Sequence, residues 1–279
     1  MAIRFLTDST ADILPQEAAA RGLAVVPLKT IFGETSYRDG FDVDHETFYK
    51  LLGESKQLPT TSQPTPEDFL PHFEAAKEAG DELICVMLSA GISGTYQSAC
   101  IAKDICDYDK IYVIDSTMAV MGMRMMLDLG EKMRAEGAAA AEIVAELERI
   151  KSKIRLYFIV DTLEYLHKGG RVSTAVTIVG GMLKMKPVLT LSEGVLGVKG
   201  KGVGVKGSLN VVEELVGQPE LDERVGVYYG YSEKDSLCRK LMERMDGKFS
   251  VPTAGNFSIG AAIGTHTGPG VAAVVYLEK

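Results

Sequence analysis

Hydroxyl-bearing side chains gather directly after several apolar runs, and one of these segments has the features of an anion site. Residues 89–95 read SAGISGT and connect the apolar run at 82–88 to a helical pattern that starts at Thr95. The first N–H groups of a helix, here from Gly94 onward, have no partner within the helix and favour anions. Ser93 adds a hydroxyl donor beside them. Alternatively, Ser93 or Thr95 only caps the helix.

Further polar segments carry similar side chains. They read TDST (7–10), TTSQP (60–64), DST (115–117) and THTGPG (265–270). Those at 7–10 and 115–117 also fit ordinary Asx and Ser/Thr turns after strands, and TTSQP also fits a solvated turn between two predicted helices. His266 is the one histidine of four that falls in a Gly/Pro-rich loop. A single histidine, however, is more often structural than functional.

A hydrolytic site is the alternative chemistry. Ser93, Asp115 and His266 follow one another in the chain order of α/β-hydrolase triads, which would make the protein a serine esterase that uses Ser93 and His266. The segment GISGT (91–95) resembles a nucleophile elbow but has Thr95 where the GxSxG pattern requires glycine. We therefore favour binding over hydrolysis.

Metal and nucleotide chemistry have little support in the residue pattern. The four cysteines are far apart and no CxxC pair, HExxH motif or matching histidine spacing occurs, so we expect no metal site and no cofactor. The segment GVGVKG (202–207) matches GxGxxG, but the acid that a dinucleotide fold needs after the next strand is missing. A Gly-rich hairpin strand is the better interpretation of this segment.

The elements that would position these side chains alternate along the chain. Seven apolar runs rich in β-branched residues fit strands, at 3–8, 23–28, 82–88, 110–115, 155–160, 186–191 and 224–230. Helical patterns separate most of them, such as the one that Thr65 and Pro66 start and Gly80 ends. The alternation predicts an α/β fold with mainly parallel sheets. Ligands of such sheets bind beyond the carboxyl ends of the strands.

Glycine becomes dense after about residue 155, which predicts a second domain with tighter turns. We expect two α/β domains, 1–155 and 156–279, packed across a ligand cleft. The first carries the TTSQP and ISGTYQ loops, and the second carries the KGGR and THTGPG loops.

Two methionine-containing segments fit either an apolar ligand or core packing. Five methionines lie between Met118 and Met126, at the start of a segment (118–154) that we predict as two helices broken near Gly137. An uncharged helical stripe is formed by Val176, Ile178, Val179, Met182, Leu183 and Met185.

Composition excludes several kinds of partner. The chain has 30 Lys and Arg against 38 Asp and Glu, a net charge of −8, with no basic block, which argues against nucleic acid as the main partner. The N-terminus has no apolar signal core, and the longest uncharged stretch (249–277) contains Pro, His and many Gly residues. We expect a cytoplasmic protein without integral membrane association.

Eight separated motifs run through nearly the whole chain. They are TDSTADI (7–13), VVPL (25–28), YRDGFD (37–42), PTTSQPTP (59–66), LSAGISGTYQSA (88–99), VIDS (113–116), DTLEYLHKGGRVS (161–173) and IGTHTGPG (263–270). Together they resemble the DegV family. The resemblance implies a non-enzymatic protein that holds a long-chain fatty acid in a tunnel. The family includes subunits of bacterial fatty acid kinase that present the bound carboxylate to a separate kinase catalytic subunit for conversion to acyl-phosphate.

The resemblance also implies roles for individual residues. Thr61, Ser62 and Ser93 are expected to bind the carboxylate, with the N–H of Gly94 beside them and His266 as a supporting donor.

The chain departs from the family pattern at two places. Residues 200–206 contain Lys201 and Lys206 but no arginine, whereas members that serve the kinase carry a basic stretch with arginine there. This difference affects the expected transfer of a phosphoryl group to the bound acid. After VIDS, Val120 and Arg124 stand among methionines where the family shows small residues, which bears on tunnel width.

Overall fold

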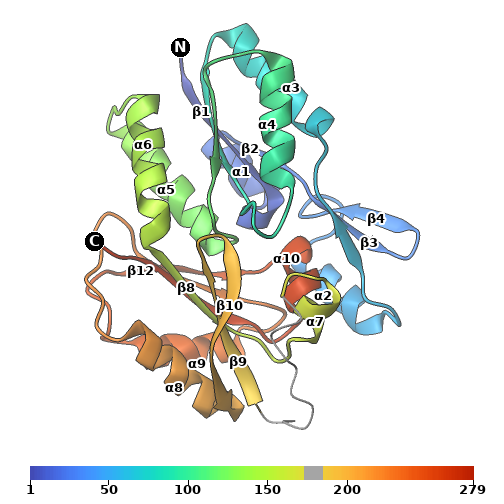
Figure 1. Ribbon diagram of the computed structural model, residues 1–279, viewed down its shortest axis with the longest axis vertical. Helices are drawn as coiled ribbons and strands as arrows, with labels where there is room; N and C mark the ends of the chain where they lie inside the picture. The colour runs from blue at the N-terminus through green and yellow to red at the C-terminus, as the bar shows by residue number, and fades with distance from the viewer. Residues whose placement is uncertain (173–184) are drawn as a thin grey trace.

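The computed structural model describes residues 1–172 and 185–279, which form two large β-sheets with helices on their faces (Figure 1). The first sheet is fully parallel, in the order β2-β1-β6-β7. Its strands are β1 (Ile3–Asp8), β2 (Leu23–Val26), β6 (Glu82–Met87) and β7 (Ile111–Asp115). All four lie in runs from which the sequence predicts strands, and the α/β class is confirmed.

Helices cover both faces of the first sheet. They are α3 (Pro66–Ala79) and α4 (Thr95–Cys106) on one face, and α1 (Pro15–Arg21), α5 (Met121–Ala135) and α6 (Ala140–Ile150) on the other. The predicted start of α3 is confirmed, because Thr65 and Asp68 form a capping box around Pro66. Its predicted end at Gly80 is also confirmed, with a φ of +67°.

The second sheet is mixed, in the order β10-β9-β8-β13-β11-β12. Its strands are β8 (Ile154–Ile159), β9 (Met185–Ser192), β10 (Val195–Val203), β11 (Val227–Tyr231), β12 (Thr253–Ser258) and β13 (Ala272–Leu277). The predicted domain boundary at 155/156 falls inside β8.

Most strand pairs of the second sheet are antiparallel. The pair β11–β12 is parallel and the other four pairs are antiparallel, so the expectation of mainly parallel strands does not hold for this sheet. One cause is local. A two-residue turn at Glu193 and Gly194, both with positive φ, folds β10 back on β9 without a crossover helix.

Two predicted loops are regular structure instead. A small third sheet joins β4 (Thr35–Arg38), β3 (Lys29–Phe32) and β5 (Thr60–Ser62), so the TTS segment is a strand. His266 lies in the last turn of α10 (Ala261–Thr267) rather than in a loop. The glycine and proline residues that suggested a loop follow this helix, which Gly268 ends with a φ of +73°.

The remaining elements complete the layers. They are η1 (Ser9–Ala11), α2 (His45–Glu54), η2 (Lys151–Lys153), α7 (Glu164–Lys168), α8 (Gly204–Val216) and α9 (Ser236–Met245). Helices α8 and α9 cover the face of the second sheet that is turned away from the first (Figure 1). The hairpin-strand interpretation of the GVGVKG segment holds only for Gly202 and Val203, which end β10, because residues 204–207 form the start of α8. Among the described residues, no helix is long and apolar enough to cross a membrane.

Helix α5 lies between the two sheets and contacts strands of both. Its methionines belong to one apolar cluster that continues into β8, β9 and β13. Met123, Met125 and Met126 are completely buried, so core packing accounts for most of the methionine group. Of the second apolar stripe, residues 176–184 lie outside the described residues.

Met126→Ala should lower the free energy of unfolding by about 2–5 kcal/mol, because deleting a fully buried side chain leaves a cavity. Urea unfolding of the full chain measures this loss. Met133, on the same helix but only partly buried, provides the matched control, and Met133→Ala should cost clearly less. Equal losses would contradict the buried face assigned to α5.

Candidate ligand-binding cavity

A cavity lies between the two sheets, beyond the carboxyl ends of β1 and β6. From the first half of the chain, Thr10 follows β1, Leu88 follows β6, and Ala119 precedes α5. From the second half, side chains of β8, β9, β10 and α10 close the space. Parallel α/β sheets bind ligands at this edge, so the position agrees with the expectation from sequence.

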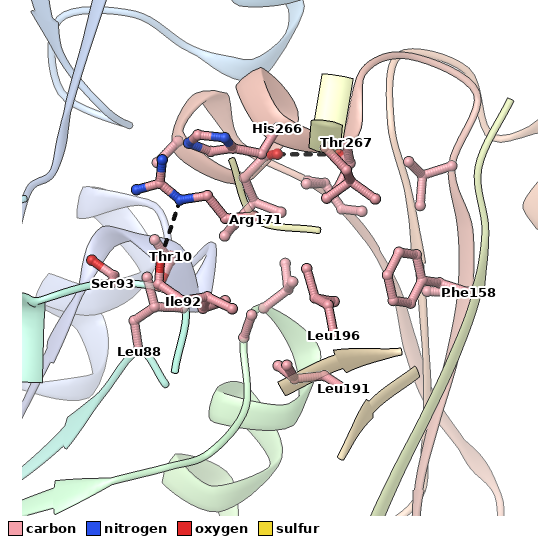
Figure 2. Close-up of a pocket in the computed structure, with 18 of the residues that line it drawn as sticks. Thr10, Leu88, Ile92, Ser93, Phe158, Arg171, Leu191, Leu196, His266 and Thr267 are labelled. Carbon is pink, nitrogen blue, oxygen red and sulfur yellow. Dashed lines mark hydrogen bonds between the residues drawn. The ribbon is translucent and has the colours of Figure 1, made fainter. Parts of the chain in front are cut away.

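The residues that line the cavity divide by chemistry. Of these, 16 are apolar and six are polar: Thr10, Thr61, Ser93, Arg171, His266 and Thr267. Figure 2 shows Ser93, Arg171 and His266 on one side, with Phe158, Leu191 and Leu196 away from them. An occupant that fits this lining is apolar over most of its length and polar at one end.

His266 reaches the polar end from α10. Its Nε2 lies 2.8 Å from the hydroxyl of Thr61 on β5, and its Nδ1 is buried without a partner among the described residues. Burial, together with the positive charge of Arg171, lowers the pKa of His266 to about 4, so the imidazole is neutral at pH 7.

The surroundings of the ring favour one tautomer. A proton on Nδ1 would be a buried donor without an acceptor, so the favoured tautomer carries it on Nε2 and donates it to Thr61. The Thr61 hydroxyl then keeps its own hydrogen for a ligand.

Ser93 lines the cavity and also supports the start of α4. Its Oγ accepts the N–H of Thr95 at 3.3 Å and lies 2.9 Å from the Thr95 hydroxyl. The N–H of Gly94 donates to Oε1 of Gln63 at 3.0 Å, and the hydroxyl of Ser62 donates to the Gln63 carbonyl at 3.3 Å. Ser62 and Gly94 are therefore bonded to Gln63 and stand outside the cavity lining.

Thr61, Ser93 and His266 come together at the polar end, and sequence reasoning missed a fourth residue there. Arg171 donates from Nε to the Ile92 carbonyl at 3.3 Å (dashed in Figure 2) and from Nη1 to the Gly169 carbonyl at 2.6 Å. Among the lining residues that the structure describes, Arg171 alone carries a full charge at pH 7. The sequence feature that could have identified Arg171 is its place directly after two glycines in KGGR, because a tight turn there can bring a cation to a ligand.

The hydrogen bonds do not assemble a Ser–His–Asp triad. His266 pairs with Thr61, Ser93 pairs with Thr95, and Asp115 accepts backbone N–H groups. Within residues 1–172 and 185–279, no hydrogen bond joins Ser93 to His266. The arrangement offers donors to a bound anion, and among the described residues no base is hydrogen-bonded to the Ser93 hydroxyl. The same ranges contain no group of three or more His, Cys, Asp or Glu that could hold a metal ion.

The fold and the site together define a two-sheet α/β protein with an apolar cavity that is polar at one end. The profile described as "Uncharacterised protein, DegV family" matches residues 2–279, and the chain belongs to the DegV family. A DegV domain-containing protein of Caldanaerobacter subterraneus subsp. tengcongensis is 35% identical over 280 residues, which cover 99% of each chain.

Solved structures share this fold. A DegV family protein from Thermus thermophilus, described by its fatty acid binding, has a TM-score of 0.90 and 30% identity over all of both chains. A stearic acid-binding protein from Eubacterium ventriosum has a TM-score of 0.87 and 28% identity, over 100% of this chain and 99% of that chain. The DegV-like fold that the resemblance implies is confirmed.

Gly169→Ala should displace His266 from Thr61. A Cβ at Gly169 would lie 2.2 Å from Nδ1 of His266, so the ring or the backbone must move. We expect the imidazole to gain contact with water and its pKa to rise from about 4 toward the ordinary histidine value.

NMR titration of the histidine ring signals measures this change. Gly53→Ala is the matched control, because a Cβ at Gly53 meets nothing within 4 Å. An unchanged His266 titration in Gly169→Ala would contradict the close packing of the ring.

Proposed function

We propose that this protein is a carrier that binds a long-chain fatty acid in the cavity, with the carboxylate at the polar end. The observation that carries the proposal is the lining, which is apolar over most of its extent and gathers hydroxyls, an imidazole and a guanidinium at one side. The fatty acid binding described for the Thermus and Eubacterium proteins supports it. The proposed function contains no bond-breaking step.

The two ends of such a ligand contribute differently. Burying about 14 methylenes at ~0.8 kcal/mol each contributes about 11 kcal/mol before the cost of immobilisation. Two or three hydrogen bonds to the carboxylate add ~1.5–3 kcal/mol each. The apolar walls therefore supply most of the affinity, and the polar end selects an acid over an alcohol or an ester.

At the polar end, we assign direct contact with the carboxylate to Thr61, Ser93 and Arg171. The two hydroxyls donate neutral hydrogen bonds, and the guanidinium donates a charge-assisted one. His266 holds the Thr61 hydroxyl in place from the other side. Ser62 and Gly94 lie outside the lining, each hydrogen-bonded to Gln63, and we assign neither a direct contact with the carboxylate.

We extend the proposal to presentation of the carboxylate to a separate kinase, the role that the family resemblance implies. Lys199, Lys201 and Lys206 are exposed on β10 and at the start of α8, where a partner can reach them. Adding ATP and a bacterial fatty acid kinase catalytic subunit to the palmitate-loaded protein tests this role. Acyl-phosphate would support it, and tight binding without phosphorylation would restrict the protein to carrying or sensing the acid.

Organic extraction of the protein purified from cells should release a near-stoichiometric fatty acid, because the apolar walls bind the chain tightly enough to survive purification. Mass spectrometry of the extract, compared with a mock purification, identifies the acid. An empty protein that also takes up no added fatty acid would overturn the carrier proposal.

Ser93→Ala should weaken binding of a fatty acid by about tenfold or more, since it removes a hydrogen bond to the carboxylate. Displacement of the fluorescent cis-parinaric acid by palmitic acid measures this affinity. Displacement by hexadecanol, which has no carboxylate, should change much less. Ser62→Ala, next to Thr61 on β5 but outside the lining, is the matched control and should change the palmitate affinity by less than about twofold.

The same variant decides between binding and hydrolysis. Equal palmitate affinity in the wild type and in Ser93→Ala would contradict the carboxylate assignment. Turnover of a chromogenic acyl ester that disappears in both Ser93→Ala and His266→Ala would establish an esterase instead.

A further inference from the structure

Helix α10 supplies the polar end of the cavity but has little stability of its own. It has seven residues, and isolated helices shorter than ~12–15 residues are marginal in water. Its N-cap is Gly260, which has no side chain with which to cap the first turn. The position of α10 must therefore come from contacts with the rest of the chain.

Two buried carboxylates from the first half of the chain hold the first turn of α10. Asp12 Oδ1 accepts the N–H of Gly260 at 3.0 Å, and Asp39 Oδ1 accepts the N–H of Ala261 at 2.9 Å. These hydrogen bonds span 248 and 222 positions of the sequence. Negative charge at the N-terminal end of a helix is also favourable electrostatically.

The packing around Gly260 leaves no room for a side chain at this position. A Cβ at Gly260 would lie 2.6 Å from Asp12 Oδ1, 2.9 Å from His45 Nε2 and 3.1 Å from Asp39 Oδ1. Three side chains from the first half of the chain thus converge on one glycine.

Arg124 of α5 contacts both sides of the same junction. It donates to the backbone carbonyl of Asp12 at 2.8 Å, and its guanidinium stacks on the Phe257 ring at 4.2 Å. Phe257 lies on β12, three residues before Gly260, so the guanidinium joins Asp12 to the strand that leads into α10.

Residues along the whole of α10 line the cavity. Ala262 and Ile263 do so from the first turn, and His266 and Thr267 from the last, where His266 faces Thr61. Because the helix has fewer than two full turns, a shift of its first turn moves the whole helix. The contacts at Gly260 therefore determine where the imidazole lies.

We propose that Asp12 and Asp39 are positioning residues for the polar end of the cavity: by holding the first turn of α10, they set His266 against Thr61. The effect of the two aspartates on ligand affinity rests on the proposed function. Their effect on the position of His266 does not. Neither aspartate lines the cavity, so we assign neither a direct contact with a ligand there.

The electrostatics of the pair fit a structural role. Burial and the neighbouring carboxylates raise the pKa of Asp12 and of Asp39, in the case of Asp39 to about 6. Either protonation state leaves an oxygen that can accept the backbone N–H, so the hold on α10 does not require a charge. An asparagine at position 12 or 39 keeps an acceptor oxygen at the same place and should therefore preserve the hydrogen bond to α10.

The test is an NMR titration of the His266 ring in the full chain without ligand. In Asp39→Ala, the freed helix should let water reach the ring, and the pKa of His266 should rise by about one unit or more. Asp39→Asn should restore the wild-type titration. Asp81→Ala is the matched control, because Asp81 is also buried and accepts hydrogen bonds from Ala2 and Arg4 away from the cavity.

Gly260→Ala provides a second variant in case Asp39→Ala does not fold, since its Cβ would push the first turn away from both aspartates. If the pKa of His266 keeps its wild-type value in whichever of Asp39→Ala and Gly260→Ala folds, the proposal is overturned. An equal shift in Asp81→Ala would also overturn it, because general destabilisation would then explain the effect.

Ligand binding gives the second readout. Asp39→Ala should lower the affinity for palmitic acid about tenfold relative to that for hexadecanol, and Asp39→Asn should not. Equal losses for acid and alcohol would overturn the link to the polar end. A wild-type protein that binds neither compound would contradict the proposed function, whereas the ligand-free titration would still decide the role of the two aspartates.

Discussion

Two hydrogen bonds from the start of α10 to Asp12 and Asp39 connect parts of the chain that lie more than 200 positions apart. The cavity depends on them, because its lining comes from both halves of the chain and α10, which carries four of the lining residues, is held at its start by these two aspartates. On the other side, α5 fills the space between the sheets with methionine and leucine side chains. The cavity therefore lies between the apolar packing around α5 and the hydrogen bonds that hold α10.

The chemistry of the polar end follows from the cost of burying charge. An ammonium or a second guanidinium among these apolar walls would have to be desolvated whenever the cavity is empty. Thr61, Ser93 and a neutral His266 avoid that cost because they carry no charge. Without a ligand, Thr61 is paired with His266 and Ser93 with Thr95. Arg171 can remain charged because it is exposed at the edge of the cavity.

Local patterns predicted many of the elements of this protein but not the small third sheet, β12, β13 or α10, and contacts distant in sequence determined the arrangement. The strands β1 and β6 and the helix α3 follow from apolar periodicity and from the cap at Thr65. The strand order of the second sheet does not, because it depends on turns and on pairings such as β8 with β13. Ser93 was identifiable from its strand–loop–helix context. The contact between Thr61 and His266 spans 205 positions, and no spacing in the sequence encodes it.

Val120 and Arg124 both depart from the family pattern, and the structure assigns them different locations and contacts. The sequence predicts that both alter tunnel width, yet of the two only Val120 lines the cavity. Arg124 is buried against Glu17, the Asp12 carbonyl and the Phe257 ring, at the junction that leads into α10. One substitution therefore acts on the shape offered to an acyl chain, and the other on the contact between the two halves of the chain. A difference in ligand preference between this protein and its relatives should accordingly follow position 120 rather than position 124.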